Sequence, residues 1–193
     1  MPHQVLLGML DSTWVDHGRR VGLLAVRLGE SLGLDAEALR RLEIAAVLHD
    51  IGKVHIDRSI LDAPRPLFPD EWQKVREHPV TGHEMLVGNV DPLVPATVLA
   101  HHERFDGSGY PHGLAGAAIP RAARVLAVAD AYDAIVSDRP YDPARSPREA
   151  LDELVRCAGT QFDPLVVDEL CQLMPSARWA WTPDGTRRAM AIA

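Results

Sequence analysis

An apolar helix that ends in histidine and aspartate constrains this chain more than any other stretch. Residues 35–50 carry apolar side chains at helical spacing, and Asp35 can cap the helix at its N-terminus. His49 and Asp50 close the helix, and Gly52 suits a helix end because glycine adopts positive φ at little cost. Such a polar pair either satisfies its own hydrogen bonds or binds a metal ion, and the pair alone leaves both interpretations open.

Helical periodicity continues along most of the chain, with little of the alternation that indicates strands. The expected helices span residues 12–32, 35–50, 69–88 with a bend or restart at Pro79, 95–103, 120–135, 147–157 and 164–174. The start of the sixth is marked by Ser146 and Glu149, which form a capping box around Pro147. We therefore expect an all-α bundle of about seven helices.

Three stretches break the helical pattern. Residues 54–68 are expected to form a loop, and residues 104–119 a long Gly-rich loop of the kind that often carries function. Near the C-terminus, Trp179 and Trp181 alternate with Ala180 and a turn signal follows at residues 183–185, which predicts a short β-hairpin or a partly ordered end. The expected organisation is a lead-in over residues 1–11, one helical domain over 12–175 and a tail over 176–193.

The amino-acid composition argues for a globular protein and against some kinds of binding partner. The 193 residues are 47% hydrophobic and carry a formal net charge of -7, which suits one globular domain and argues against a general nucleic-acid binder. No apolar run reaches membrane-spanning length, so no membrane partner is expected. The two cysteines, Cys157 and Cys171, are too far apart for a Cys-x-x-Cys motif, and a reducing cytoplasmic location is expected.

Several metal-binding side chains recur on or at the ends of the expected helices. Asp130, for example, interrupts a strongly apolar helix, where a carboxylate needs a partner. The full set is His17, His49, Asp50, His78, His101, His102 and Asp130. Each histidine alone would be interpreted as a hydrogen-bonded core or surface residue, but five imidazoles and two carboxylates together suit two divalent ions that share a bridge. Because no cysteine joins the set, iron or manganese is favoured and zinc is a further option.

Six of these seven residues, all but His17, lie in motifs that resemble the HD-GYP family, a branch of the HD-domain metal phosphohydrolases. The matching motifs are Leu48-His49-Asp50-Ile51-Gly52-Lys53, His78-Pro79 with Gly82, His101 through Pro111, Ala129-Asp130-Ala131-Tyr132-Asp133-Ala134, Asp138-Arg139-Pro140-Tyr141 and Gly159-Thr160-Gln161-Phe162-Asp163-Pro164. Their order and spacing agree over roughly residues 17–170. The resemblance implies an HD-domain helical bundle and hydrolysis of cyclic di-GMP by residues 12–175, to linear pGpG or onward to GMP.

The resemblance also implies roles for individual residues. His17, His49 and Asp130 look like ligands of one metal, and His78, His101 and His102 like ligands of the other. Asp50 is assigned as the bridging carboxylate, and a water shared by two metals would ionise near neutral pH and attack phosphorus. Lys53 is one of only two lysines, and it is predicted to hold a substrate phosphate as a point charge. The predicted substrate contacts are Lys53, Tyr110, Asp133 at a guanine edge, and Arg139.

Two positions depart from the family pattern. Thr13 stands where members with a third metal carry glutamate, which argues for two metals and for the linear dinucleotide as the main product. Asp142 stands where the family commonly has a basic residue, and its charge would weaken binding of an anionic ligand by about 1 kcal/mol if it faced the pocket.

Other functions stay open from the sequence. One is hydrolysis of another cyclic dinucleotide or nucleotide, and the second is a catalytically poor binding or docking module. The Gly109-Tyr110-Pro111 loop resembles a docking surface for diguanylate-cyclase domains. The Trp-containing tail either covers an edge of the core or mediates a homodimer.

Overall fold

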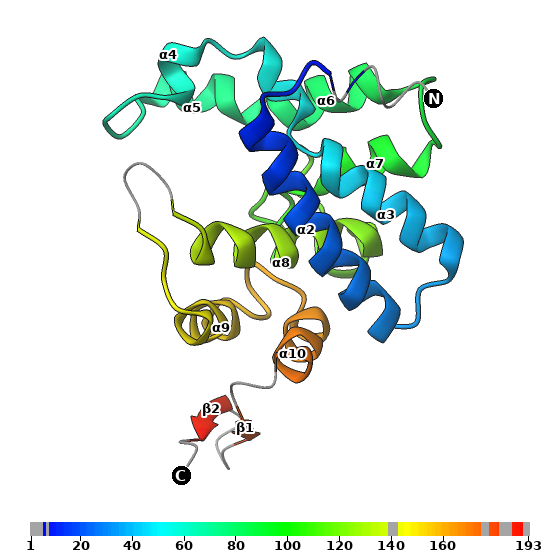
Figure 1. Cartoon of the computed structure of the whole chain (residues 1–193), viewed down its shortest axis with the longest axis vertical. Coiled ribbons are helices and arrows are strands. Elements are labelled where there is room, and N and C mark those ends of the chain that lie inside the picture. The colour runs from blue at the N-terminus through cyan, green and yellow to red at the C-terminus, as the bar shows by residue number, and fades with distance from the viewer. Residues whose placement is uncertain (1–5, 7, 139–142, 175–177, 182–186, 191–193) are drawn as a thin grey trace.

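A long helix pair forms the centre of the computed structural model, which describes residues 6, 8–138, 143–174, 178–181 and 187–190. Helix α2 (Ser12–Ser31) is followed by α3 (Ala36–Leu48), and Gly33 turns the chain between them with a φ of 77°. Asp35 caps α3 by accepting hydrogen bonds from the backbone N–H groups of Glu37 and Ala38, as the sequence predicts. Figure 1 shows α2 crossing α8 (Arg121–Val136), so three separate segments meet at the centre of the molecule.

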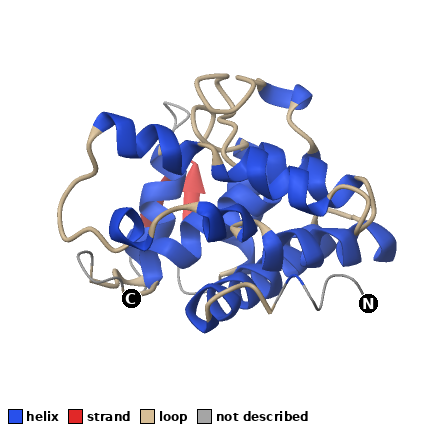
Figure 2. Ribbon diagram, turned by 90° about the horizontal axis from the view of Figure 1, so that it is seen from above, coloured by secondary structure: helices blue, strands red, loops and turns tan. Residues whose placement is uncertain are grey.

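The remaining elements surround this centre. On one side lie η1 (Ile51–His55), α4 (Arg58–Leu61), α5 (Pro69–Arg76), α6 (His78–Leu86) and α7 (Leu93–Ala100). On the other lie α9 (Pro147–Arg156) and α10 (Pro164–Leu173), while the short η2 (Gly116–Ala118) lies within the long loop. The predicted all-α bundle is confirmed, and Figure 2 shows that helices dominate the described chain.

The core lies where α2, α3, α7 and α8 pack together. Val21, Leu42, Val98 and Leu126 supply one buried side chain from each of these helices. Each such side chain stabilises the fold by about 1.5–3 kcal/mol through removal of apolar surface from water. This packing fixes the relative positions of the four helices that carry most of the predicted metal ligands.

The expectation of a loop throughout residues 54–68 is wrong at two places. Residues 51–55 form the 3₁₀ helix η1, and residues 58–61 form the single-turn helix α4. Asp57 begins α4 by accepting a hydrogen bond from the backbone N–H of Ser59. A helix of one turn has too few residues to produce a periodic apolar pattern, which is why the sequence does not reveal it.

Gly52 allows the backbone of η1 to pass close to the backbone of α6, and its φ is not positive. The glycines with positive φ in the described chain are Gly33, Gly88, Gly107, Gly113, Gly116 and Gly159. A Cβ atom on Gly52 would instead lie 2.1 Å from the carbonyl oxygen of His78 and 2.7 Å from the backbone nitrogen of Gly82. The predicted reason for Gly52 is therefore wrong, because only glycine lets η1 pack this closely on α6.

The long loop over residues 104–119 is confirmed, and a buried carboxylate organises it. Glu103 is 4% exposed, and it accepts hydrogen bonds from the backbone nitrogens of His112 at 2.7 Å and Leu114 at 3.0 Å. Gly109 passes so close to the start of the loop that a Cβ atom there would lie 2.2 Å from the backbone nitrogen of Arg104. The loop is thus folded back on the end of α7 and held there.

Two strands follow α10 and form the antiparallel pair that the tail sequence predicts. Strand β1 (Arg178–Trp181) pairs with β2 (Arg187–Met190), with Arg178 opposite Met190. The turn predicted at residues 183–185 lies outside the described residues. In the part of the chain that the structure describes, no helix combines the length and apolar character needed to span a membrane.

Candidate metal centre

A cavity of about 390 Å³ lies where the ends of several helices converge. The residues that line it include Lys53, Tyr110 and Trp72, together with six of the seven predicted metal ligands. These six are His17, Asp50, His78, His101, His102 and Asp130. The seventh, His49, is buried directly behind them, with its ring centroid 5.2 Å from those of both His17 and His101. The structure thus brings all seven residues together.

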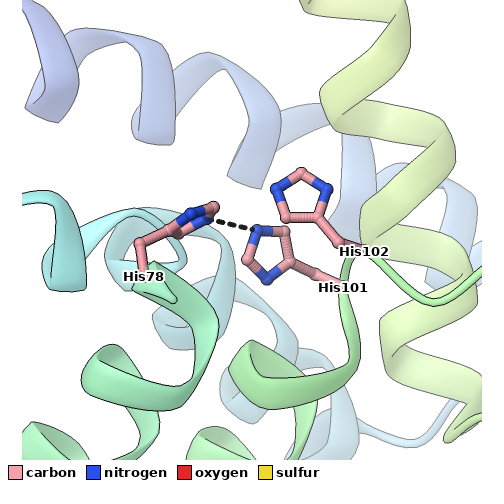
Figure 3. A group of neighbouring side chains, drawn as sticks. All are labelled: His78, His101 and His102. Atoms are coloured by element: carbon pink, nitrogen blue, oxygen red, sulfur yellow. Dashed lines mark hydrogen bonds between the residues drawn. The ribbon is translucent and has the colours of Figure 1, made fainter. Parts of the chain in front are cut away.

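One cluster consists of His78, His101 and His102, whose potential ligand atoms lie within 4.8 Å of one another. Figure 3 shows these rings converging from the beginning of α6 and the end of α7. The Nδ1 atom of His78 donates to the carbonyl oxygen of Val75 at 2.7 Å, and that of His101 donates to Val98. Because a carbonyl only accepts, each neutral ring carries its proton on Nδ1 and a lone pair on Nε2.

The two Nε2 atoms of His78 and His101 lie 3.3 Å apart, as the dashed line in Figure 3 marks. With both protons on Nδ1, two lone pairs face each other across this gap. Burial lowers the pKa of His78 to about 3 and that of His102 to about 4, and it also lowers the pKa of His101. The cluster therefore presents neutral nitrogen donors without a shared proton, which is the form that binds a cation.

A second cluster consists of His17, His49 and Asp50, also with ligand atoms within 4.8 Å of one another. His49 donates from Nδ1 to the carbonyl oxygen of Ala46 at 2.7 Å, and its Nε2 lies 3.8 Å from Oδ1 of Asp130. The Nε2 atom of His17 lies 3.1 Å from the same Asp130 oxygen. Asp130 thus joins this cluster from α8.

Asp50 connects the two clusters. Its Oδ2 lies 3.6 Å from Nε2 of His49, and its Oδ1 lies 3.4 Å from Nε2 of His78. Burial would raise the pKa of Asp50, but the Lys53 ammonium, 2.6 Å from Oδ2, outweighs that effect and the pKa stays well below its usual range. Among the described residues, none donates a hydrogen bond to the buried Oδ1. An ionised, buried oxygen of this kind fits a cation.

His17 differs from the other histidines in its charge. Burial would lower its pKa, but hydrogen bonds to Asp130 and Asp133 outweigh that effect and raise the pKa to about 9. Asp133 lies 2.7 Å from Nδ1 of His17 and is held by Arg20 on its other side. The positive charge of protonated His17 therefore balances the negative charge of the nearby carboxylates, a role that a metal cation would otherwise fill.

The structure describes some of the remaining predicted substrate contacts and departures from the family pattern, and not others. Tyr110 stacks on His102 with ring centroids 4.9 Å apart, and the Arg76 guanidinium lies 4.6 Å from the Tyr110 centroid. Asp133 is only 6% exposed. Arg139 and Asp142 lie outside the described residues. Thr13, in the first turn of α2, donates hydrogen bonds from its backbone and its hydroxyl to Asp11.

Two residues at the site were not identified from the sequence. Arg20 lies one helical turn beyond His17, which is the only signal for it, and many surface arginines share that spacing. Trp72 on α5 lines the cavity with 51% of its surface exposed. An aromatic residue within an amphipathic helix pattern reads as a core residue, so only the structure shows its position at the cavity.

Comparisons with known proteins identify the family of this chain. A family model described as "HD domain" matches residues 5–166. The chain is 45% identical over 154 residues to the cyclic di-GMP phosphodiesterase response regulator RpfG of Xanthomonas campestris, an alignment that covers 78% of this chain and 41% of RpfG. It is 35% identical over 159 residues to the 3'3'-cGAMP-specific phosphodiesterase 2 of Vibrio cholerae, covering 81% of this chain and 30% of that protein.

A solved structure, the HDG"Y"P protein Bd1817 from Bdellovibrio bacteriovorus, matches with a TM-score of 0.69 at 23% identity. The match covers 83% of this chain and 52% of the Bdellovibrio chain. The chain belongs to the HD domain family, and its predicted place in the HD-GYP branch is confirmed. It spans less than half the length of the two curated relatives described above.

Proposed function

We propose that this chain is a metal-dependent phosphodiesterase that hydrolyses cyclic di-GMP to linear pGpG. One observation carries the proposal: two clusters of imidazoles and carboxylates share Asp50 at the floor of a cavity. Paired metal sites of this kind are typical of enzymes that cleave phosphate esters. The cyclic di-GMP phosphodiesterase name of the 45% identical relative supports the choice of substrate.

The donor set fits two divalent ions. His17, His49 and Asp130 would hold one, His78, His101 and His102 the other, and Asp50 would contribute to both. The facing lone pairs of His78 and His101 and the unpaired oxygen of Asp50 support this assignment. Nitrogen and oxygen donors without thiolate suit iron or manganese, with zinc as a further option. When bound, the ions would activate a water molecule and neutralise charge on the phosphate.

The cavity walls would then bind the substrate. Lys53 reaches the cavity beside Asp50, where its ammonium would hold a non-bridging phosphate oxygen as a point charge. Tyr110 and Trp72 would supply aromatic surface for a guanine base. Asp133 at a guanine edge, Arg139, and docking of diguanylate-cyclase domains on the Gly109-Tyr110-Pro111 loop stay predictions from the family resemblance. A homodimer and the catalytic domain bounds of 12–175 stay predictions from the sequence.

The test is anaerobic turnover of cyclic di-GMP by protein loaded with iron(II) or manganese(II), with products separated by chromatography. We expect linear pGpG to appear and chelation to abolish it. Lys53→Ala should lose most of the activity, whereas Lys74→Ala, the other lysine of the chain, should retain it. Absence of cyclic di-GMP hydrolysis with either metal in fully loaded protein would contradict the proposal.

A second candidate is hydrolysis of a different cyclic dinucleotide on the same site. The 3'3'-cGAMP-specific relative favours this alternative. Parallel assays with cyclic di-GMP, 3'3'-cGAMP and cyclic di-AMP would rank the substrates by kcat/KM. Binding of nucleotide without turnover in any metal, retained in His49→Ala and Asp50→Ala, would instead indicate a binding or docking module.

A further inference from the structure

We infer that Asp133 and Arg20 are positioning residues that hold His17 in the orientation needed for metal binding. This role rests on the proposed function, since it takes His17 to be a metal ligand. The Nδ1 atom of His17 donates to Oδ2 of Asp133 at 2.7 Å. Arg20 then donates to both oxygens of the same carboxylate, from Nε at 2.8 Å and from Nη2 at 2.9 Å. Three side chains from α2 and α8 thus form one connected unit.

The position of His17 within its helix explains why it needs this unit. His49, His78 and His101 follow the last turn of a helix, where backbone carbonyls lack helical partners, and each donates from Nδ1 to the carbonyl three residues earlier. His17 instead lies inside α2 (Ser12–Ser31), where the carbonyls already accept helical hydrogen bonds. Its Nδ1 proton therefore requires a side-chain acceptor, and Asp133 supplies one from α8.

The two nitrogens of the His17 ring connect Asp133 to the candidate metal centre, because one faces Asp133 and the other faces Asp130. With Nδ1 fixed on Asp133, Nε2 of His17 faces Asp130 at 3.1 Å. A carboxylate behind a ligating histidine sets its tautomer and raises its basicity, and loss of such a partner typically weakens metal binding 10–100-fold. Arg20 holds the carboxylate in a two-pronged contact that fixes its plane. Asp133 is only 6% exposed, and Arg20 supplies the positive charge that its buried carboxylate needs.

The role inferred here differs from direct contact with a guanine edge. Direct contact would raise the KM for cyclic di-GMP and leave metal binding unchanged when substrate is absent. Positioning would change metal binding without any substrate. Metal affinity of the substrate-free protein therefore separates the two roles, and it does so even if the proposed substrate is wrong.

The experiment is calorimetric titration of the apo protein with Mn²⁺ in the absence of nucleotide. In Asp133→Asn, we expect one of about two sites to weaken 10–100-fold while the other keeps its affinity. Retained binding at the second site shows that the variant is folded. Arg20→Gln should weaken the same site less, because Asp133 stays in place. Wild-type affinity at both sites in Asp133→Asn and Arg20→Gln would overturn the inference.

A matched control lies on the same helix. Arg124 on α8 pairs with the buried Asp163, which also caps α10 through the backbone N–H of Leu165. Asp163→Asn neutralises a buried carboxylate that is also paired with an arginine but is not among the residues that line the cavity. We expect it to lower thermal stability and to leave both Mn²⁺ affinities unchanged. If Asp163→Asn lost as much metal binding as Asp133→Asn, the effect of Asp133 would be one of fold stability. That result would overturn the positioning role.

Discussion

The two histidine clusters of the candidate centre are built in different ways. The cluster of His78, His101 and His102 is oriented largely by local backbone, since two of its rings donate to carbonyls three residues earlier in the chain. The cluster of His17, His49 and Asp50 depends on tertiary packing, because His17 is held by Asp133, 116 residues away. The first cluster therefore requires α6 to pack on α7, and two of its rings are oriented by their own backbone. The second requires α2 to pack on α8, and its His17 is oriented by a distant side chain.

The clusters also differ in charge. Burial lowers the pKa of His78 to about 3 and that of His102 to about 4, so that cluster is made of neutral nitrogen donors. The other cluster adds the carboxylate of Asp130, and its His17 has a pKa raised to about 9 despite burial, through hydrogen bonds to Asp130 and Asp133. A centre of this kind offers two chemically distinct halves joined at Asp50.

Removal of the shared carboxylate should have the largest effect. Asp50→Asn takes away the charge that lies within 3.6 Å of imidazoles from both clusters. We expect binding at both metal sites to weaken and kcat to fall by at least about 10³-fold, since metal activation contributes several kcal/mol and each 1.36 kcal/mol is tenfold. Metal analysis and turnover on one sample measure both. Asp57→Asn, at an exposed helix cap, is the control.

Removal of one imidazole from each cluster should separate the halves. His78→Ala and His17→Ala should each lose about one metal per chain while keeping the other, with turnover reduced by at least about 10²-fold. Metal content after gel filtration provides the measurement. If both variants kept the wild-type metal content, neither histidine would be a ligand and the division into two halves would fail.

The close packing of η1 on α6 at Gly52 is predicted to leave no room for a side chain. Gly52→Ala would place a Cβ atom 2.1 Å from the carbonyl oxygen of His78, so η1 and α6 must separate. We expect a loss of about 1–3 kcal/mol in the free energy of unfolding, measured by urea denaturation of the apo protein. Gly22→Ala is the matched control, because its Cβ would lie at an ordinary 3.7 Å from Ala46 and should cause no loss. Equal stability of the two variants would contradict the packing argument.

A smaller effect is expected from the aromatic stack on His102. Tyr110→Ala removes a ring that lies 4.9 Å from the His102 ring, whereas Tyr110→Phe keeps it. Because such stacking contributes about 0.5–1.5 kcal/mol, Tyr110→Ala should weaken Mn²⁺ binding by at most about 2–13-fold at the His78, His101 and His102 site. Tyr110→Phe should bind as the wild type does. An equal loss in both variants would show that the hydroxyl, and not the stack, matters.

The sequence predicts those features that local chemistry determines. All seven expected helical stretches are found, with the cap at Asp35 and the capping box at Ser146 and Glu149, because apolar periodicity and caps act over a few residues. The helix expected over residues 95–103 is shifted to Leu93–Ala100, so His101 and His102 follow its end. The restart expected at Pro79 is found one residue earlier, with α5 ending at Arg76 and α6 starting at His78. The convergence of seven candidate ligands was predicted from their residue types and from the family resemblance together.

Features that depend on tertiary contacts could not be predicted from the sequence. The unit formed by His17, Asp133 and Arg20 joins residues more than 110 positions apart, and the spacing of His17 and Arg20 does not indicate that Asp133 is their partner. Gly52 has the residue type expected of a helix end, but its reason is the backbone of α6 beside it. The short helices η1 and α4 lack the length that periodicity requires.

The most direct test of the account is the number of metal ions bound per chain, measured on the same iron(II)- or manganese-loaded sample that is assayed with cyclic di-GMP. The account predicts about two ions per chain together with formation of linear pGpG. A chain that binds no metal, or that hydrolyses cyclic di-GMP at full rate with a single ion, would contradict a centre built from two halves around Asp50.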